Sequence, residues 1–252
     1  MYSLPSAGAS ARRFGALAAL ALLAACNGDS LLAPGSRSEL LAPAPPPHYP
    51  IIFVHGYNAS AATWLTMVSR FKIDGYTDAE LVNWSYDYRL SNATTASKLK
   101  AKIDSVLLAS GAHHVDIITH SMGSLSARYM TRNLLSATDM RVDAVVNLGG
   151  TNHGTVTAFG CTPVSCSEMR PYSSFVTRLN STDETWGRPR YATWWSPCDE
   201  VINPDNSALL EGATNNQTAC IQHSQLHEDA TVYAAVKQFV NPTLPSAIVA
   251  MR

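Results

Sequence analysis

The residues of this chain best suited to covalent chemistry are Ser121 and its neighbours. Residues 115–119, Val-Asp-Ile-Ile-Thr, have the length and composition of a buried strand, and His-Ser-Met-Gly follows. Residues 124–135 then have the composition of a helix. A strand, a sharp turn with a serine at its tip and a helix form a nucleophile elbow, which presents the hydroxyl at the carboxyl end of the strand. The segment therefore predicts a nucleophilic serine, with the Met122 N–H at the helix start as one oxyanion donor.

The elbow departs from the usual G-x-S-x-G pattern at one position. Thr119 stands where the first glycine is expected, whereas Gly123 keeps the second. A serine with one glycine two residues later also fits a plain strand-to-helix turn. The interpretation therefore depends on whether the rest of the chain supplies an oxyanion loop, an acid and a base.

A second candidate loop follows residues 50–54, Pro-Ile-Ile-Phe-Val, which read as a strand buried on both faces. His55, Gly56 and Tyr57 come directly after it. Gly56 allows the backbone to turn so that the Tyr57 N–H points into a site, which gives the second oxyanion donor. His55 lies too early in the chain to be the base, and we expect it to be a structural hydrogen-bonding residue.

The acid and the base are expected after the serine, in the order serine, acid, histidine. Asp199 follows a β-rich segment and is the first choice for the acid, with Glu200 as the alternative. Two histidines, His223 and His227, precede the last helix. If residues 219–222 are the last strand, His227 lies deeper in the loop, so His227 is the preferred base.

The elements that must position these residues alternate along the chain. We expect strands at residues 50–54, 81–84, 115–119, 142–148 and 191–195, and a last strand for which residues 219–222 are the candidate. We expect helices at 60–71, 93–108, 124–135 and 228–240, with a short helix around 172–179. Alternating strands and helices predict an α/β fold with a mostly parallel central sheet and helices on both faces. The region 151–190 is long and irregular, and it is a candidate cover for the cleft.

Four cysteines follow the N-terminal region, which suggests two disulfide bonds in an exported chain. Three pairings are allowed, and we expect Cys161–Cys166 and Cys198–Cys220. The second bond would join the acid loop to the segment that leads to the histidines. No C-x-x-C pair is present, so we expect no metal site.

The N-terminus predicts export. Arg12 and Arg13 precede an apolar run that is shorter than the roughly 20 residues needed to span a bilayer, as in a signal peptide. Cys26 ends Leu-Ala-Ala-Cys, which resembles a bacterial lipobox. We expect residues 1–26 to be a signal peptide with a lipidated Cys26, 27–50 a Pro/Ala-rich tether and 51–252 the catalytic domain. The expected location is the outer membrane, with secretion as the alternative.

Composition limits the partners further. The 252 residues carry a net charge of -1 and contain no basic cluster, so no nucleic-acid partner is expected. The partners expected are an ester or lipid substrate and a membrane reached through the lipid anchor. We expect a monomer that needs no cofactor.

Taken together, these motifs resemble the class 2 bacterial lipases, the group that includes lipase A of Bacillus. The resemblance runs from about residue 51 to 240 and uses the His55-Gly56 loop, the Ser121 elbow, Asn-Leu-Gly-Gly at 147–150, the Asp199 loop and the His223-x-x-x-His227 spacing. It implies a minimal α/β-hydrolase fold and a catalytic role for the second late histidine, His227. The lipobox, the tether, the cysteines, Ser124 and the longer 151–190 region are departures from the family.

The sequence thus predicts a serine carboxylester hydrolase with Ser121, His227 and Asp199 as its triad. Fatty-acyl glycerol esters or shorter esters are the expected substrates. Two alternatives remain: a cutinase-like polyester hydrolase, suggested by Tyr57 and the Trp and Tyr content, and a catalytically silent surface lipoprotein that uses the fold for binding.

Overall fold

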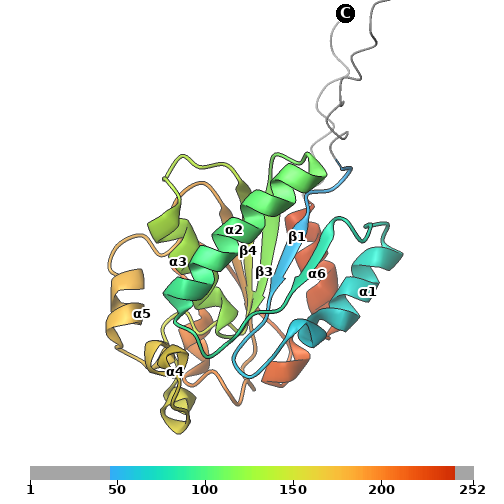
Figure 1. The fold of residues 1–252 in the computed structure, drawn as a ribbon. Coiled ribbons are helices and arrows are strands. Elements are labelled where there is room, and N and C mark those ends of the chain that lie inside the picture. Colours follow the sequence, from blue (N-terminus) through green and yellow to red (C-terminus); the bar gives the residue numbers. More distant parts are fainter. Residues whose placement is uncertain (1–45, 242–252) are drawn as a thin grey trace, which may run out of the picture. The chain divides into compact units, whose positions relative to one another are not determined.

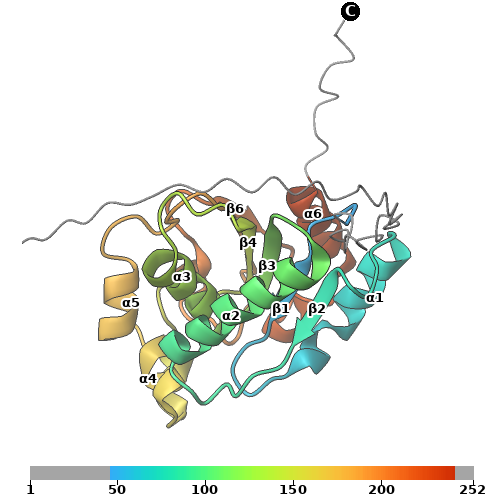
Figure 2. The same ribbon diagram turned by 45° about the horizontal axis from the view of Figure 1, so that its top comes forward.

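The structure, a computed structural model, describes residues 46–241, which contain one six-stranded sheet. The sheet has the order β2-β1-β3-β4-β5-β6, and every pair of neighbouring strands is parallel. Figure 2 labels the strands from β2 through β1 and β3 to β4. The strands are β1 (Ile51–Val54), β2 (Leu81–Trp84), β3 (Val115–His120), β4 (Val142–Leu148), β5 (Arg190–Trp195) and β6 (Thr214–Gln217). The predicted α/β class is confirmed, with a sheet that is parallel throughout.

Helices cover both faces of the sheet because the central strands are apolar on both sides. Ile51 and Phe53 of β1 face α1 (Leu65–Ile73) and α6 (Ala230–Val240). Ile52 and Val54 face the opposite layer, α2 (Asn92–Ser110) and α3 (Gly123–Leu134). Figure 1 shows α2 in front of the strands and α6 behind them. Burying one such side chain fully contributes roughly 1.5–3 kcal/mol, so the two layers hold the strands in register.

Short polar residues set the helix ends. Ser60 caps the 3-10 turn η1 (Ala61–Trp64) that leads into α1, and Ser91 and Asp229 cap α2 and α6. Gly111, with a φ of 70°, ends α2 in the left-handed conformation. These ends agree with the predicted helices to within a few residues.

The β4–β5 connection, residues 149–189, is the longest excursion from the sheet. It contains the turn η2 (Val156–Gly160) and two short helices, α4 (Val164–Met169) and α5 (Ser174–Leu179), seen at the lower left of Figure 1. The prediction gave one short helix here. Buried side chains of α4 and α5 join Met122 and Leu125 of the elbow in a third apolar cluster.

The predicted last strand at residues 219–222 is wrong. Strand β6 is Thr214–Gln217, an edge strand of sequence Thr-Asn-Asn-Gln that is mostly exposed. Because its side chains face water, it has no apolar pattern for sequence reasoning to find. The loop after the last strand therefore begins earlier than expected and includes His223, which opens the 3-10 turn η4 (His223–Gln225).

The strand order places the candidate site. Strand β1 lies between β2 and β3, so the chain adds β2 on one side of β1 and then adds β3 to β6 on the other side. In open parallel sheets, sites form at the carboxyl ends of the strands beside such a switch point. The loops after β1 and β3 hold Gly56 and Ser121, so the fold brings the two predicted oxyanion loops together.

The signal peptide, Cys26 and most of the tether lie outside the described residues. Within residues 46–241, none of the helices combines the length and the apolar character that a membrane crossing needs.

Candidate active site

Ser121 occupies the strained turn that the elbow requires. Its φ is 55°, and it is one of only three non-glycine residues with positive φ among residues 46–241. Its N–H continues the sheet by donating to the Leu148 carbonyl at 2.9 Å, and its carbonyl accepts the Ser124 N–H at 3.1 Å. The side chain is 6% exposed. Strand bonding on one side and the helix start on the other hold this conformation, which would otherwise cost about 1–3 kcal/mol.

The structure explains why the G-x-S-x-G pattern keeps its second glycine, at Gly123, and has Thr119 in place of the first. A Cβ on Gly123 would lie 2.6 Å from the Val54 carbonyl oxygen, so only glycine lets α3 begin this close to β1. Thr119 is fully buried, and its hydroxyl lies 2.8 Å from Asn147 Oδ1 on β4. The threonine side chain is therefore accommodated in the sheet.

Gly56 brings the β1 loop against the serine. A Cβ at this position would lie 2.8 Å from Ser121 Cβ and 3.3 Å from its Oγ. The glycine is thus needed for space. The predicted oxyanion donors, the N–H groups of Tyr57 and Met122, belong to the residues that follow Gly56 and Ser121 in these two touching loops.

His55 has the structural role that the sequence predicts. Its Nδ1 lies 2.9 Å from the Gly56 carbonyl oxygen, and its Nε2 lies 3.3 Å from the Tyr86 N. The ring stacks on Tyr86 at 4.0 Å. Burial lowers the pKa of His55, which favours the neutral ring that these two bonds require. The histidine thereby fixes the loop that contains Gly56.

Asp199 contacts a histidine directly. Its Oδ2 lies 2.8 Å from Nδ1 of His223, and its Oδ1 accepts the N–H groups of Val201 and Ile202 at 2.9 and 2.8 Å. The side chains of Asp199 and His223 are only 2% and 8% exposed. Because the carboxylate accepts the Nδ1 proton, Nε2 of His223 is left as the basic nitrogen.

His227 does not make the contact expected of it. Its Nδ1 is buried without a hydrogen-bond partner among the described residues. The ring packs edge-on against His120, with centroids 4.7 Å apart, and lies 5.9 Å from Trp64. Burial lowers the pKa of His227. The structure therefore pairs Asp199 with His223, the histidine that the sequence analysis placed second.

His120 connects the elbow to the histidine loop. It precedes Ser121, and its Nε2 lies 3.0 Å from the His223 carbonyl oxygen. Burial lowers the pKa of His120 well below its usual value, so the ring is neutral and donates through Nε2–H. Sequence reasoning did not single out His120.

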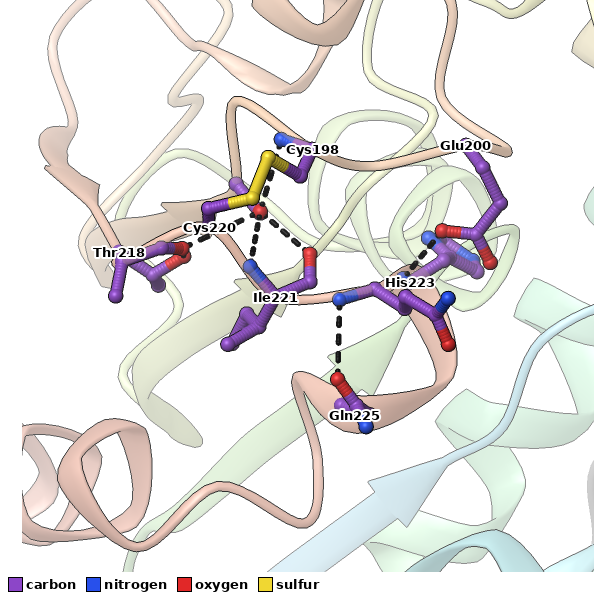
Figure 3. The surroundings of a disulfide bond; sticks show 10 residues. Cys198, Glu200, Thr218, Cys220, Ile221, His223 and Gln225 are labelled. Carbon is purple, nitrogen blue, oxygen red and sulfur yellow. Dashed lines mark hydrogen bonds between the residues drawn. A yellow bond between two sulfur atoms is a disulfide. The ribbon is translucent and has the colours of Figure 1, made fainter.

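The loop that contains Asp199 (the acid loop) and the segment that contains His223 (the histidine loop) are linked at further points. Ser196 Oγ accepts the Ile221 N–H at 3.0 Å and lies 2.5 Å from the Ile221 carbonyl oxygen. The disulfide Cys198–Cys220 joins the same two segments, and Figure 3 shows it beside the Glu200–His223 contact. Both predicted disulfide bonds are present, the other being Cys161–Cys166.

Apolar side chains surround the predicted oxyanion donors. Tyr57 packs edge-on against Tyr88 with centroids 5.0 Å apart, and both belong to the cluster around Met122. Among residues 46–241, no group of three or more His, Cys, Asp or Glu side chains is arranged to hold a metal ion.

Comparison with known families agrees with this geometry. Residues 48–243 match the family model for lipase (class 2). The chain belongs to the class 2 lipase family. It is accordingly a carboxylic ester hydrolase of the lipase and esterase kind.

Solved structures show the same fold. The mature lipase BlEst2 of Bacillus licheniformis is 16% identical with a TM-score of 0.67, and the match covers 78% of this chain and 94% of that one. Lipase B of Aspergillus fumigatus is 17% identical with a TM-score of 0.63, over 77% of this chain and 52% of that one. The α/β-hydrolase MGS-MChE2, from a lagoon-sediment metagenome, is 15% identical with a TM-score of 0.55, over 79% and 93%. The class 2 lipase thus has the predicted α/β-hydrolase fold.

Proposed function

We propose that this chain hydrolyses carboxylic esters through an acyl-enzyme, with Ser121 as nucleophile, His223 as general base and Asp199 as the acid that orients it. The observation that supports this most is the 2.8 Å contact between Asp199 Oδ2 and His223 Nδ1. The contact selects the tautomer with a basic Nε2, which is what a serine nucleophile requires. His227, the base expected from the sequence, has no contact with the acid.

In the first half-reaction, Ser121 Oγ attacks the ester carbonyl carbon while its proton passes to His223 Nε2. The tetrahedral oxyanion accepts the N–H groups of Met122 and Tyr57, and in other enzymes one such donor contributes roughly 3 kcal/mol. The imidazolium returns the proton to the leaving alcohol as the C–O bond breaks. Water then attacks the acyl-enzyme, and the same groups release the acid and free Ser121.

The substrates proposed are fatty-acyl glycerol esters or shorter-chain esters. Tyr57 and Tyr88, which are partly buried against the apolar cluster around Met122, offer apolar surface beside the proposed oxyanion donors for an acyl chain. A polyester substrate and a binding role without catalysis are the outcomes that the following experiment distinguishes from this proposal.

The test is hydrolysis of p-nitrophenyl esters from C2 to C16 by the soluble domain, beside Ser121→Ala. We expect turnover that is lost in the variant, with a chain-length optimum that separates esterase from lipase. Fluorophosphonate should label the wild type and not Ser121→Ala. Silence across the series with labelling intact would point to a polymer substrate, and silence without labelling would contradict the proposed hydrolase.

We also propose that the chain is an exported lipoprotein anchored through Cys26, with the outer membrane as its location. The tether would join the domain before β1, at the amino edge of the sheet, whereas Ser121 lies at the carboxyl edge. Cys26→Ser should abolish labelling by radioactive palmitate and release the protein from membrane fractions; unchanged labelling would refute the anchor.

A further inference from the structure

The main chain of His223 is held on both sides. Its N–H donates to Glu200 Oε2 at 2.9 Å, and its carbonyl accepts from His120 Nε2 at 3.0 Å. The side chain is held separately by Asp199 at 2.8 Å. Two consecutive acids therefore contact one histidine through different atoms, Asp199 through the ring and Glu200 through the peptide N–H.

These two contacts fix different degrees of freedom. The bond from Asp199 sets the tautomer and the rotation of the ring, whereas a bond to the peptide nitrogen sets the position of the main chain that bears the ring. A general base must reach the proton it removes at about 2.6–3.2 Å. Because a carboxylate accepting an N–H makes a charge-assisted bond, Glu200 is a stronger restraint than a neutral acceptor would be.

The place of Glu200 in the loop supports the same role. Residues 196, 198 and 200 each reach the histidine segment: Ser196 at Ile221, Cys198 at Cys220 and Glu200 at His223. Figure 3 shows both the disulfide and the contact between Glu200 and His223. Of these three cross-links, the one from Glu200 acts on the histidine itself.

We propose that Glu200 is a positioning residue of the ester hydrolase, which places His223 for proton transfer by holding its peptide N–H. The inference rests on the proposed triad, since it has a catalytic meaning only if His223 is the base. It also gives Glu200, an alternative for the triad acid in the sequence, a distinct role beside Asp199.

The experiment compares Glu200→Ala, Glu200→Gln and a control, Glu211→Ala, on a soluble p-nitrophenyl ester. Glu211 is an exposed acid at the amino end of β6, the edge opposite His223. A loosened base should lower kcat of Glu200→Ala by about 10- to 100-fold, with KM within about twofold because Glu200 need not touch the substrate. Glu200→Gln keeps an acceptor oxygen at the same reach and should recover kcat to within about threefold of wild type. Glu211→Ala should match wild type.

Two results would overturn the proposal: wild-type kcat in Glu200→Ala, or a loss in Glu200→Gln as large as in Glu200→Ala. If Glu200→Ala does not fold, Glu200→Met replaces it, because it keeps the length of the side chain without the carboxylate, and the same outcomes apply. Fluorophosphonate labelling distinguishes a failure of the Glu200 role from a failure of the proposed triad. A labelled wild type with an inactive Ser121→Ala and a fully active Glu200→Ala would remove only this inference, whereas an active Ser121→Ala would remove the triad as well.

Discussion

The two disulfide bonds of this domain lie in regions of opposite character. Cys198–Cys220 spans 22 positions and joins the acid loop to the histidine loop, where hydrogen bonds from Ser196, Asp199 and Glu200 add to it. Cys161–Cys166 spans 5 positions and closes a small loop within the β4–β5 connection. The first bond connects two parts of the proposed catalytic arrangement, and the second shapes a segment that leaves the sheet.

The surfaces of the two regions differ as well. Four large apolar side chains of the β4–β5 connection are exposed: Val156 (45%), Phe159 (63%), Val164 (48%) and Tyr172 (94%). Arg128 of α3 nevertheless anchors this connection to the core. It is buried and donates to the Asn152 carbonyl and to Asn180 Oδ1. Burial lowers the pKa of Arg128 to about 10, which still leaves it charged at neutral pH. The acid and histidine loops hold the proposed reacting groups in place, whereas the β4–β5 connection presents apolar side chains to the surface.

The largest effect on kcat should come from His223, the histidine that Asp199 contacts. His223→Phe removes the proposed base and should lower kcat by about 10⁴-fold or more, whereas His227→Phe should keep kcat within about threefold. His227→Phe also replaces a buried, unpartnered nitrogen with carbon, so the free energy of unfolding should stay the same or rise by about 1 kcal/mol. Ester turnover and thermal unfolding of the matched pair check this. Loss of activity in His227→Phe alone would return the base to His227.

Removing each disulfide should affect stability in both regions but ester turnover in only one. The Cys198→Ala, Cys220→Ala double variant should lose about 3 kcal/mol of unfolding free energy and the Cys161→Ala, Cys166→Ala variant about 2, since the longer loop restrains the unfolded chain more. The first variant should also lower kcat on a soluble ester several-fold because the two loops lose a link. The second should leave that kcat near wild type. Equal kcat values in the two variants would show that the first disulfide is no more catalytic than the second.

Acid should destabilise the two regions in different pH ranges. The pKa of His120 lies well below 6.5 through burial and the neighbouring His223 and His227, so below pH 6.5 the unfolded chain binds a proton that the folded chain does not. Stability should therefore fall with falling pH from about 6.5, by at most about 1.4 kcal/mol per pH unit for this group. His120→Gln, which can still donate to the His223 carbonyl, should flatten the slope between pH 6.5 and 5.

The β4–β5 connection should respond at lower pH. Burial acts to raise the pKa of Glu184, but hydrogen bonds from His153 and the Glu211 N–H outweigh it, and the pKa is lowered from 4.5. The contribution of this carboxylate is complete above pH 4.5 and is lost as the pH falls further. Urea unfolding of wild type and His120→Gln from pH 7 to 4 separates the two ranges. Identical slopes in the two proteins above pH 5 would contradict the assignment to His120.

Sequence reasoning predicts the parts of this molecule that have strong local patterns. The apolar strands β1, β3 and β4, the capped helix α2 and the Ser121 elbow all have such patterns, and they were predicted to within a few residues. The structure also contains both expected disulfides. These elements are defined by residues close together in the chain.

The parts that sequence reasoning missed depend on long-range contacts or lack an apolar pattern. Strand β6 is polar because it is an exposed edge, and misplacing it at 219–222 made His227 seem the deeper histidine. The roles of His120, Glu200 and Arg128 rest on partners 103, 23 and 52 positions away, which no local pattern encodes. The Asp199–His223 pair needed the fold to decide between two histidines four residues apart.

The smallest effect on stability is expected at Tyr172, which lies in the β4–β5 connection and shares with Ser121 a positive φ. Both are non-glycine residues with positive φ, 59° for Tyr172 and 55° for Ser121, but Ser121 is buried at the carboxyl end of the central strand β3 and Tyr172 is 94% exposed. Few contacts offset the left-handed conformation of an exposed tyrosine, which costs roughly 1–2 kcal/mol. Tyr172→Gly should therefore raise the unfolding free energy by about 0.5–1 kcal/mol, after the larger entropy loss of glycine is subtracted.

If the exposed Tyr172 ring helps the enzyme to bind an emulsified ester, Tyr172→Gly should lose several-fold activity on that substrate. The variant should keep wild-type kcat on a soluble ester. Ile73→Ser is the control, since Ile73 is 82% exposed at the end of α1, near the amino edge of the sheet. It should leave both activities unchanged. A Tyr172→Gly enzyme that is more stable and equally active on both substrates would mean that the apolar surface of the β4–β5 connection makes no contribution to catalysis at Tyr172. The two regions would then differ only through the acid and histidine loops.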